Sequence, residues 1–275
     1  MSAFGRLIMS DNYRTTVGKV QLVSLTDGHF EPVPTDVFQD SDIETWQSEY
    51  SALMIDKDHT QFRFGSVAIY SSSKIVVVDT GAGPNGCLID DMGAKGVERE
   101  DVDFVLITHL HADHTGWTLL EGEPTFANAR YLVPKDDYAY WTQPNVISNA
   151  PNIANDVVPL KSLGVIDLIE PKHIITSELT TVHTPGHTPG HTSLAISSNS
   201  ESGFVLGDVA HSPAQAHYTD WNPNFDVDQE LSRETRNQVL DELEEQGILV
   251  QAGPFPEPGF GHFSRENNRR YWQGV

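Results

Sequence analysis

The 275-residue sequence predicts a single α/β domain spanning residues 1–275. Two observations favour this fold class. Short β-branched and apolar runs alternate with helical patterns, as is typical of sheets covered by helices. No stretch rich in proline, glycine and serine divides the chain, although the polar segment 143–156 is expected to form a surface loop.

The first third of the chain is expected to be rich in strands. A near-continuous apolar run over residues 102–107 then predicts a buried strand that leads into a histidine-rich segment. The other expected strands cover residues 20–25, 66–70, 75–78, 129–133, 180–183, 193–196, 204–206 and 248–251, and the expected helices cover residues 135–141 and 228–246. The long helix is expected to end at Gly247, because glycine commonly follows the last helical turn.

The composition restricts the possible partners. Seventeen basic residues against 39 acidic ones give a formal net charge of −22, which disfavours binding to nucleic acid and to anionic membrane surfaces. The first thirty residues do not resemble a secretory leader, and no apolar run is long enough to span a bilayer, so a cytoplasmic protein is expected. With one cysteine, Cys87, a metal site would have to use imidazole and carboxylate ligands.

The segment from Thr108 to Gly116 concentrates four potential metal ligands, His109, His111, Asp113 and His114. Two histidines separated by one residue point the same way from extended backbone. Zinc and similar divalent ions bind imidazole and carboxylate at about 2.0–2.2 Å. A lone histidine is usually structural, but four potential ligands within six positions predict a metal centre in which one pair serves one ion and the next pair a second.

This segment resembles the His-x-His-x-Asp-His signature of the metallo-β-lactamase superfamily. The resemblance recurs in order along the chain. Residues 76–81 resemble the strand and aspartate turn before the signature, residues 184–187 the next ligand motif, and residues 204–208 the strand that carries a metal-bridging aspartate. The resemblance implies a four-layer αβ/βα sandwich with the site at one edge of its two sheets.

The resemblance also implies roles for individual residues. His109, His111 and His187 would bind the first ion, Asp113 and His114 the second, and Asp208 would bridge the two. Zinc is the metal expected, although manganese, cobalt or iron would accept the same ligands. The remaining histidines of this region, His183 and His191, are expected not to bind metal, and Asp79 is expected to orient a ligand.

The sequence departs from the family pattern at the final ligand. A second-metal histidine is expected just after the last strand, where Pro254 stands instead. His262 is the nearest substitute, eight residues later. If His262 does not bind, the second ion is expected to be weakly held or absent.

The predicted function is hydrolysis of a small ester, lactone or phosphotriester by a metal-activated hydroxide. Within the superfamily, His211 and the segment from Phe255-Pro256 to His262 most resemble the methyl parathion hydrolase and quorum-quenching lactonase-like branch. Asp113 is expected to assist proton transfer, and His211 to donate a hydrogen bond to the oxyanion or leaving group or else to be a structural loop residue. The substrate-binding residues expected are Trp117 and Phe260.

Two other interpretations keep the metal site. Oxygen reduction at a di-iron centre is disfavoured, because the signature histidines are intact and no flavin domain follows. A catalytically degenerate member that only binds a metal and a ligand is the main alternative, and the missing histidine favours it. The sequence predicts a small-molecule substrate. It leaves open the natural substrate, the metal and the oligomeric state, although relatives of this compact type are commonly homodimers.

Overall fold

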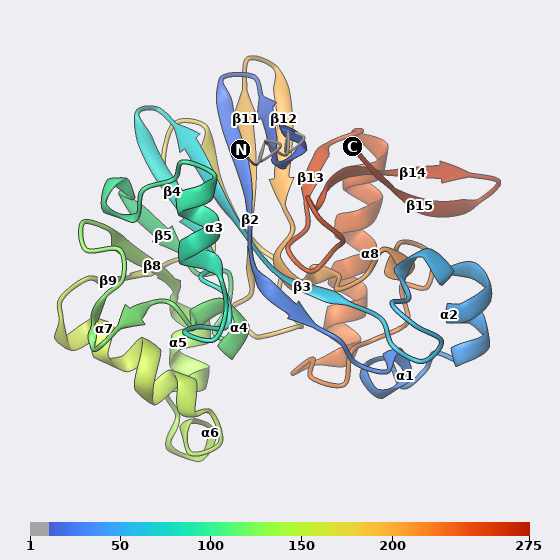
Figure 1. Ribbon diagram of the computed structural model, residues 1–275, viewed down its shortest axis with the longest axis horizontal. Helices are drawn as coiled ribbons and strands as arrows, with labels where there is room; N and C mark the ends of the chain where they lie inside the picture. The colour runs from blue at the N-terminus through green and yellow to red at the C-terminus, as the bar shows by residue number, and fades with distance from the viewer. Residues whose placement is uncertain (1–10) are drawn as a thin grey trace, which may run out of the picture.

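The computed structural model describes residues 11–275 and shows two β-sheets stacked face to face, with helices on both outer faces (Figure 1). The predicted four-layer αβ/βα sandwich is therefore confirmed. Strands β2 and β3 run through the centre of the molecule, with α3, α5 and α7 on one side and α8 on the other (Figure 1).

The first sheet is seven-stranded and has the order β1-β2-β3-β4-β5-β8-β9. Its strands are β1 (Arg14–Val17), β2 (Val20–Phe30), β3 (Phe62–Ser71), β4 (Lys74–Val78), β5 (Phe104–Leu106), β8 (Arg130–Pro134) and β9 (Ile166–Ile169). The pairs from β1 to β4 are antiparallel, whereas β4, β5, β8 and β9 are parallel. Parallel neighbours present their carboxyl ends at one edge, which is where ligands commonly bind in such sheets.

The second sheet is six-stranded and runs in sequence order from β10 to β15. Its strands are β10 (Leu179–His183), β11 (Thr192–Ser198), β12 (Glu201–Val205), β13 (Leu249–Gln251), β14 (Phe260–Glu266) and β15 (Arg269–Gly274). Only β12 and β13 pair in parallel, and a small separate hairpin joins β6 (Leu119–Leu120) to β7 (Glu123–Pro124).

The helices cover the sheets and the loops at the site. The α-helices are α1 (Pro34–Val37), α2 (Ile43–Glu49), α3 (Leu88–Ala94), α4 (Ala112–Thr115), α5 (Lys135–Trp141), α6 (Pro144–Ile147), α7 (Val158–Ser162) and α8 (Gln229–Glu245). Shorter turns of helix are η1 (Asp11–Tyr13), η2 (Ser51–Leu53), η3 (Arg99–Asp101), η4 (Ile153–Val157), η5 (Gly207–Val209) and η6 (Pro213–Ala216).

The core between the sheets follows from the alternation of side chains along each strand. Leu22, Val67 and Ile69 of the first sheet meet Leu194 and Ile196 of the second. Successive residues of a strand point to opposite faces, so their neighbours Val23 and Ala68 face the helical layer instead. This alternation makes each strand contribute to two layers of the core.

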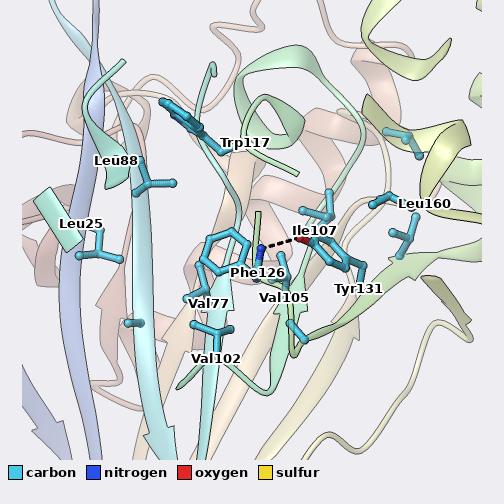
Figure 2. Packing of buried hydrophobic residues seen from close by; sticks show 14 of the residues in the cluster. Leu25, Val77, Leu88, Val102, Val105, Ile107, Trp117, Phe126, Tyr131 and Leu160 are labelled. Carbon is cyan, nitrogen blue, oxygen red and sulfur yellow. Dashed lines mark hydrogen bonds between the residues drawn. The ribbon is translucent and has the colours of Figure 1, made fainter. Parts of the chain in front are cut away.

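The outer core on the first sheet packs α3 and α7 against the strands (Figure 2). Leu88 and Leu160 come from these helices and Val105 from β5. Tyr131 is fully buried, and its hydroxyl donates to Thr118 O at 2.9 Å and accepts from Phe126 N at 3.1 Å. The buried phenol is therefore satisfied at both its donor and its acceptor.

Most strands expected in the first third and around the ligand motifs are present. The expected surface loop at residues 143–156 is wrong in part, because α6 and η4 occupy most of it and Ile153 packs into the core. The hairpin of β14 and β15 was not predicted from the sequence, and its exposed ends carry charged residues that hide the strand alternation. Within residues 11–275, no helix is long and apolar enough to cross a membrane.

Helix α8 contains a fully buried arginine, Arg236. Its guanidinium donates to Val209 O at 2.8 Å and to Asn222 Oδ1 at 2.9 Å, and it lies 3.5 Å from the carboxylate of Asp226. Burial lowers the pKa of Arg236 to about 10, which leaves it charged at neutral pH. The arginine therefore balances a buried carboxylate at the inner side of the helix.

Replacing Arg236 with alanine is expected to destabilise the protein by about 3–5 kcal/mol, because it leaves the buried carboxylate of Asp226 without its cation. Urea unfolding measures this loss. The matched control is Arg233→Ala, an exposed position on the same helix, which is expected to change stability by less than about 0.5 kcal/mol. Equal stabilities for the two variants would contradict the assignment.

Candidate metal centre

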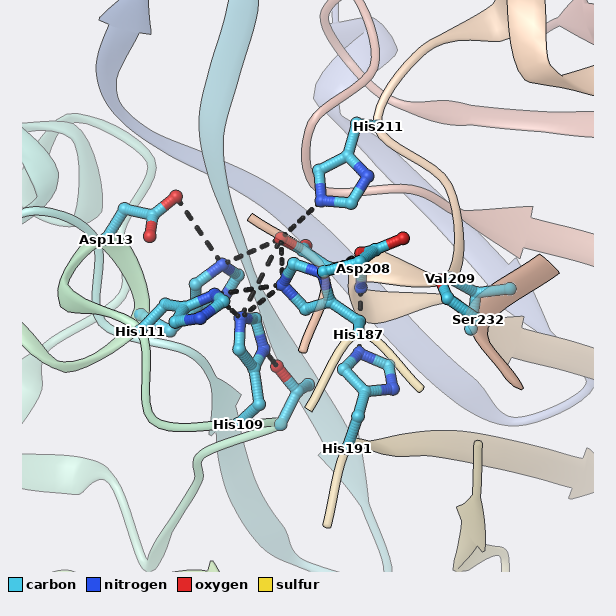
Figure 3. A network of polar contacts seen from close by, with 12 residues as sticks. His109, His111, Asp113, His187, His191, Asp208, Val209, His211 and Ser232 are labelled. Carbon is cyan, nitrogen blue, oxygen red and sulfur yellow. Dashed lines mark hydrogen bonds and ion pairs between the residues drawn. The ribbon is translucent and has the colours of Figure 1, made fainter. Parts of the chain in front are cut away.

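The loops after β5, β10 and β12 converge at one edge of the sandwich. His109 and His111 follow β5, His187 follows β10, and Asp208 lies in η5 directly after β12. These loops leave the carboxyl ends of strands from both sheets, so the fold brings together residues that are about a hundred positions apart. The structure thus places the implied ligands in a single cluster (Figure 3).

Three imidazole nitrogens point at one another in this cluster. His109 Nε2 lies 3.1 Å from His111 Nδ1 and 3.1 Å from His187 Nε2, and the latter two are 2.9 Å apart. Four donors at about 2.0–2.1 Å from a tetrahedral zinc ion are about 3.3 Å from one another. The triangle of nitrogens therefore has nearly the dimensions of one face of such a site.

Asp208 Oδ2 lies at the centre of a second set of donors. It is 3.5 Å from His187 Nε2, 3.3 Å from His114 Nε2 and 3.1 Å from His211 Nε2. Asp113 Oδ2 lies 3.6 Å from His114 Nε2. Asp208 faces both sets, as expected of a carboxylate that bridges two ions.

The electrostatics agree with cation binding. Burial, together with the neighbouring imidazoles, lowers the pKa of His109 and His187 well below the usual value, and it lowers that of His111 to about 3. Burial also opposes ionisation of Asp208, but His114 and His211 outweigh it and lower its pKa. At neutral pH the three imidazoles are neutral and the carboxylate is charged, which is the protonation state that metal binding requires.

Other residues hold the ligands in place. Asp226 Oδ1 lies 2.7 Å from His187 Nδ1, and Asp79 Oδ2 lies 2.9 Å from His114 Nδ1. Carboxylates in this position fix the ring orientation of metal-binding histidines. The expected role of Asp79 in orienting a ligand agrees with this contact, whereas Asp226 was missed because no sequence motif surrounds it.

Asp137 ties two of the ligand loops together. Its carboxylate accepts hydrogen bonds from Leu110 N at 2.9 Å and from Gly190 N at 2.6 Å. Burial raises the pKa of Asp137 to about 6. The loop carrying His109 and His111 is thereby joined to the loop that follows His187.

His191 positions the bridging aspartate and does not reach the cluster as a ligand. Its Nε2 accepts a hydrogen bond from Asp208 N at 2.9 Å, and its Nδ1 lies 3.0 Å from Thr184 O. His183 is exposed, with Nε2 3.0 Å from Pro189 O. Neither belongs to the groups of donors that could hold a metal ion, as the resemblance implied.

Three predicted site residues lie away from the cluster, in contrast to their predicted roles. His262 is on β14, where its Nδ1 lies 3.0 Å from Ile248 O. Trp117 packs into the outer core and donates from Nε1 to Asp27 Oδ1 at 2.9 Å. Phe260 is buried in the core between the sheets. The sequence placed all three near the ligand loops, but core packing and β-pairing turn them away from the metal cluster and its cavity.

A cavity of about 640 Å³ opens above the cluster. His111, Asp113, His114, Asp208 and His211 contribute to its floor. The aromatic walls are formed by Phe30, Phe62, Phe64, Trp141 and Phe225. These phenylalanines could not be predicted as cavity residues, because they come from distant segments that meet only in the folded chain.

The residues present fit two divalent ions. Asp208 Oδ1 is buried without a hydrogen-bond partner, and the convergent nitrogens of His109, His111 and His187 have no proton arrangement that satisfies all three contacts. A buried carboxylate without a partner or cation is costly. Cations in the two sets of donors would remove both problems.

Removing the metal is expected to lower the thermal stability of the protein, because the buried donors then lose their counter-charge. Restoring zinc at about one hundred times its dissociation constant should stabilise the fold by about 2.7 kcal/mol. Thermal unfolding with chelator, and again after adding zinc, measures the effect. The His262→Ala variant should respond like the wild type, and an unfolding temperature indifferent to metal would contradict the site.

The pH dependence of stability should contain a contribution from His191, because burial lowers the pKa of this side chain to about 3. The unfolded chain takes up this proton near pH 6.5, so stability is lost as the pH falls from about 6.5 towards 3. His191→Gln should reduce that slope by up to about 1.4 kcal/mol per pH unit.

Urea unfolding of the metal-free protein at several pH values tests the His191 prediction. The control is His183→Gln, at an exposed position on β10. If the free energy of unfolding depends on pH equally in His191→Gln and the wild type, the pKa of His191 is not lowered in the folded chain.

Comparison with known proteins agrees with this site. Part of the chain is 32% identical to the N-acyl homoserine lactonase AttM of Rhizobium radiobacter over 131 residues, a match that covers 46% of this chain and 48% of that protein. The match therefore spans about half the length of this relative.

Solved structures share the fold over nearly the whole chain. AidC, a dizinc quorum-quenching lactonase in complex with a product, superposes with a TM-score of 0.86 at 19% identity, covering 95% of this chain and 96% of that one. The hydrolase AbOPH of the beta-lactamase superfamily gives a TM-score of 0.86 at 25% identity, covering 96% and 97%. Residues 62–252 match the metallo-beta-lactamase superfamily, which includes the signature, the next ligand motif and the bridging aspartate. The chain belongs to the metallo-beta-lactamase superfamily.

Proposed function

We propose that this protein is a zinc-dependent hydrolase that opens the ring of a lactone, with N-acyl homoserine lactones as the substrate class. The observation that carries the proposal is the cluster of histidines and aspartates at the floor of an aromatic-walled cavity of about 640 Å³. A cavity of that size is within the range of small-molecule sites. Its polar floor and apolar walls suit a substrate with a reactive polar head and an apolar tail.

The comparisons support lactone hydrolysis over the other predicted reactions. One partial relative is named as an N-acyl homoserine lactonase, and a structure with the same fold is described as a quorum-quenching lactonase. They give no support to the phosphotriester option that the sequence had left open.

The proposed chemistry divides between the ions and the chain. Bound divalent ions supply a Lewis acid and lower the pKa of water towards neutrality. The carboxylate of Asp113 faces the cavity and is partly exposed, with 40% of its side chain accessible. It can take the proton of the attacking water and return it to the leaving ring oxygen.

The aromatic walls would hold the acyl chain. Trp141 lies edge-on to His111, with ring centroids 5.2 Å apart, and Phe225 lies 6.4 Å from the same ring. Both line the cavity, and Phe225 is 40% exposed. An alkyl chain bound here would cover apolar surface next to the reacting group, which favours longer acyl chains.

The alternative is a degenerate member that binds metal and ligand without turnover. The absence of a histidine at Pro254 is the feature that favours it. Against it, Asp113, Asp208 and the three imidazoles are all in place. Metal content together with turnover distinguishes the two functions.

Activity should be measured on acyl-homoserine lactones of short and long acyl chain, an aryl ester and an aryl phosphotriester. Chelator-sensitive turnover is expected to be highest on the lactones. Asp208→Asn should lose more than about a hundredfold in kcat/KM, because the carboxylate shared by both donor sets is removed. Metal binding without turnover on any substrate would favour the degenerate alternative, and preference for the phosphotriester would contradict the lactonase proposal.

Trp141→Ala should change chain-length selectivity more than catalysis itself. The expected result is a KM about tenfold higher for a long-chain lactone and nearly unchanged for a short-chain one, because only the long chain reaches the indole. Steady-state kinetics on both substrates measures this. An equal loss on both would show that Trp141 acts through the adjacent His111 and not through the acyl chain.

A further inference from the structure

His211 is a buried histidine whose ring has one polar partner among the described residues, the carboxylate of Asp208. The residue is only 5% exposed, and its Nδ1 has no hydrogen-bond partner. Leaving a buried polar nitrogen without a partner costs free energy. The ring is directed at Asp208, with Nε2 3.1 Å from Oδ2 (Figure 3).

The expected position of the final metal ligand has no donor side chain. Gly253 and Pro254 line the cavity there, and their carbonyls are used by Arg63, which donates from Nε to Gly253 O at 3.0 Å and from its amide to Pro254 O at 3.1 Å. His262 is held against Ile248 O on β14. The donor set around the second ion is therefore one imidazole short unless another residue provides it.

We propose that His211 provides this imidazole and binds the second metal ion together with Asp113, His114 and Asp208. Asp208 Oδ2 lies 3.3 Å from His114 Nε2 and 3.1 Å from His211 Nε2. Both distances are close to the separation of about 3.3 Å between ligands of a tetrahedral zinc ion. Asp113 Oδ2 lies 3.6 Å from His114 Nε2 and would be the fourth donor.

The orientation of His211 distinguishes this role from hydrogen bonding to substrate. A donor to an oxyanion would aim its N–H into the cavity, away from the ligands. Instead, Nε2 approaches the same oxygen of Asp208 that His114 and His187 approach. His211 thus belongs with His187 and Asp208 to a group of donors that could hold a metal ion, and metal binding is the alternative to the predicted hydrogen bond to the oxyanion or leaving group.

The local sequence fixes the backbone of His211. Gln215 Oε1 accepts from His211 N at 2.6 Å, and Ser212 caps η6 through a reciprocal pair of hydrogen bonds with Gln215. Gln215 Nε2 in turn donates to Trp221 O at 2.8 Å. The ring is packed against Phe225, with centroids 5.2 Å apart. This turn presents the imidazole three residues after Asp208, so one short segment supplies two donors.

The test uses the full chain stripped of metal and reloaded with cobalt(II) or zinc. The wild type should bind two ions. His211→Ala should bind one ion tightly and lose more than about a hundredfold in affinity for the other, which exceeds the loss of about 10–100-fold typical when a residue that only orients a ligand is removed. His262→Ala is the matched control and should keep both ions. Metal analysis and calorimetric titration provide the readout.

The variant His211→Cys tests whether residue 211 binds the metal itself or only lies beside the residues that do. A thiolate bound to cobalt gives a strong charge-transfer absorption in the near ultraviolet, which should appear in this variant and be absent from the wild type. Cys87, exposed and present in every variant, serves as the internal control. Diffraction from zinc-loaded wild-type crystals should place the second ion about 2.1 Å from His211 Nε2.

Several outcomes would overturn the proposal: two tightly bound ions in His211→Ala, no thiolate absorption in folded His211→Cys, a second zinc ion away from His211, or only one ion in the wild type. The inference rests on the proposed metal-dependent function, but the two fail separately. Lactone turnover with a single ion would reject the His211 site and keep the lactonase, whereas two ions with loss of one in His211→Ala, and no turnover, would do the reverse.

Discussion

The carboxylate of Asp208 is the constraint on which the rest of the site depends. It is buried at the meeting point of four imidazoles, with Oδ2 between 3.1 and 3.8 Å from each of them. Nearby positive charge is required to keep it ionised there. In the chain itself His114 and His211 lower the pKa of Asp208, and divalent ions held by the two sets of donors would add to that positive charge.

The architecture follows from the need to hold this carboxylate still. Asp208 follows a strand of the second sheet, and the signature histidines follow a strand of the first. The two sheets must therefore stack with these strand ends at the same edge. His191 fixes the amide of Asp208, and Asp137 ties the loops on either side. From Arg236 through Asp226 to His187, a buried chain of charge and hydrogen bonds connects α8 to the metal site. The long helix thus stabilises a ligand as well as covering a sheet.

Much of the fold and most of the ligands could be predicted because their signals are local. Four potential ligands stand within six positions, and Asp208 directly follows an apolar strand. The cavity could not be predicted in this way. Trp117 is close to the signature in sequence and yet points into the core, while Phe225 reaches the cavity from a loop that carries no motif. Which way a ring turns depends on packing across the whole domain.

The assignment of His211 illustrates the same limit at a single residue. The sequence showed that His211 stands three positions after Asp208, and that Pro254 replaces the expected metal-binding histidine. Whether its ring faced the substrate or the carboxylate depended on the turn built by Ser212 and Gln215, which only the structure shows.

The close approach of two glycines has an evolutionary consequence. A side chain at Gly65 would meet Gly253 O at 2.2 Å, and one at Gly253 would meet Gly65 O at 2.9 Å. Each position therefore restricts the other, and a side chain at either one would force β3 away from the loop that follows β13. Substitutions at these two positions are therefore coupled, because a larger residue at one of them is tolerated only if the opposing segment also changes.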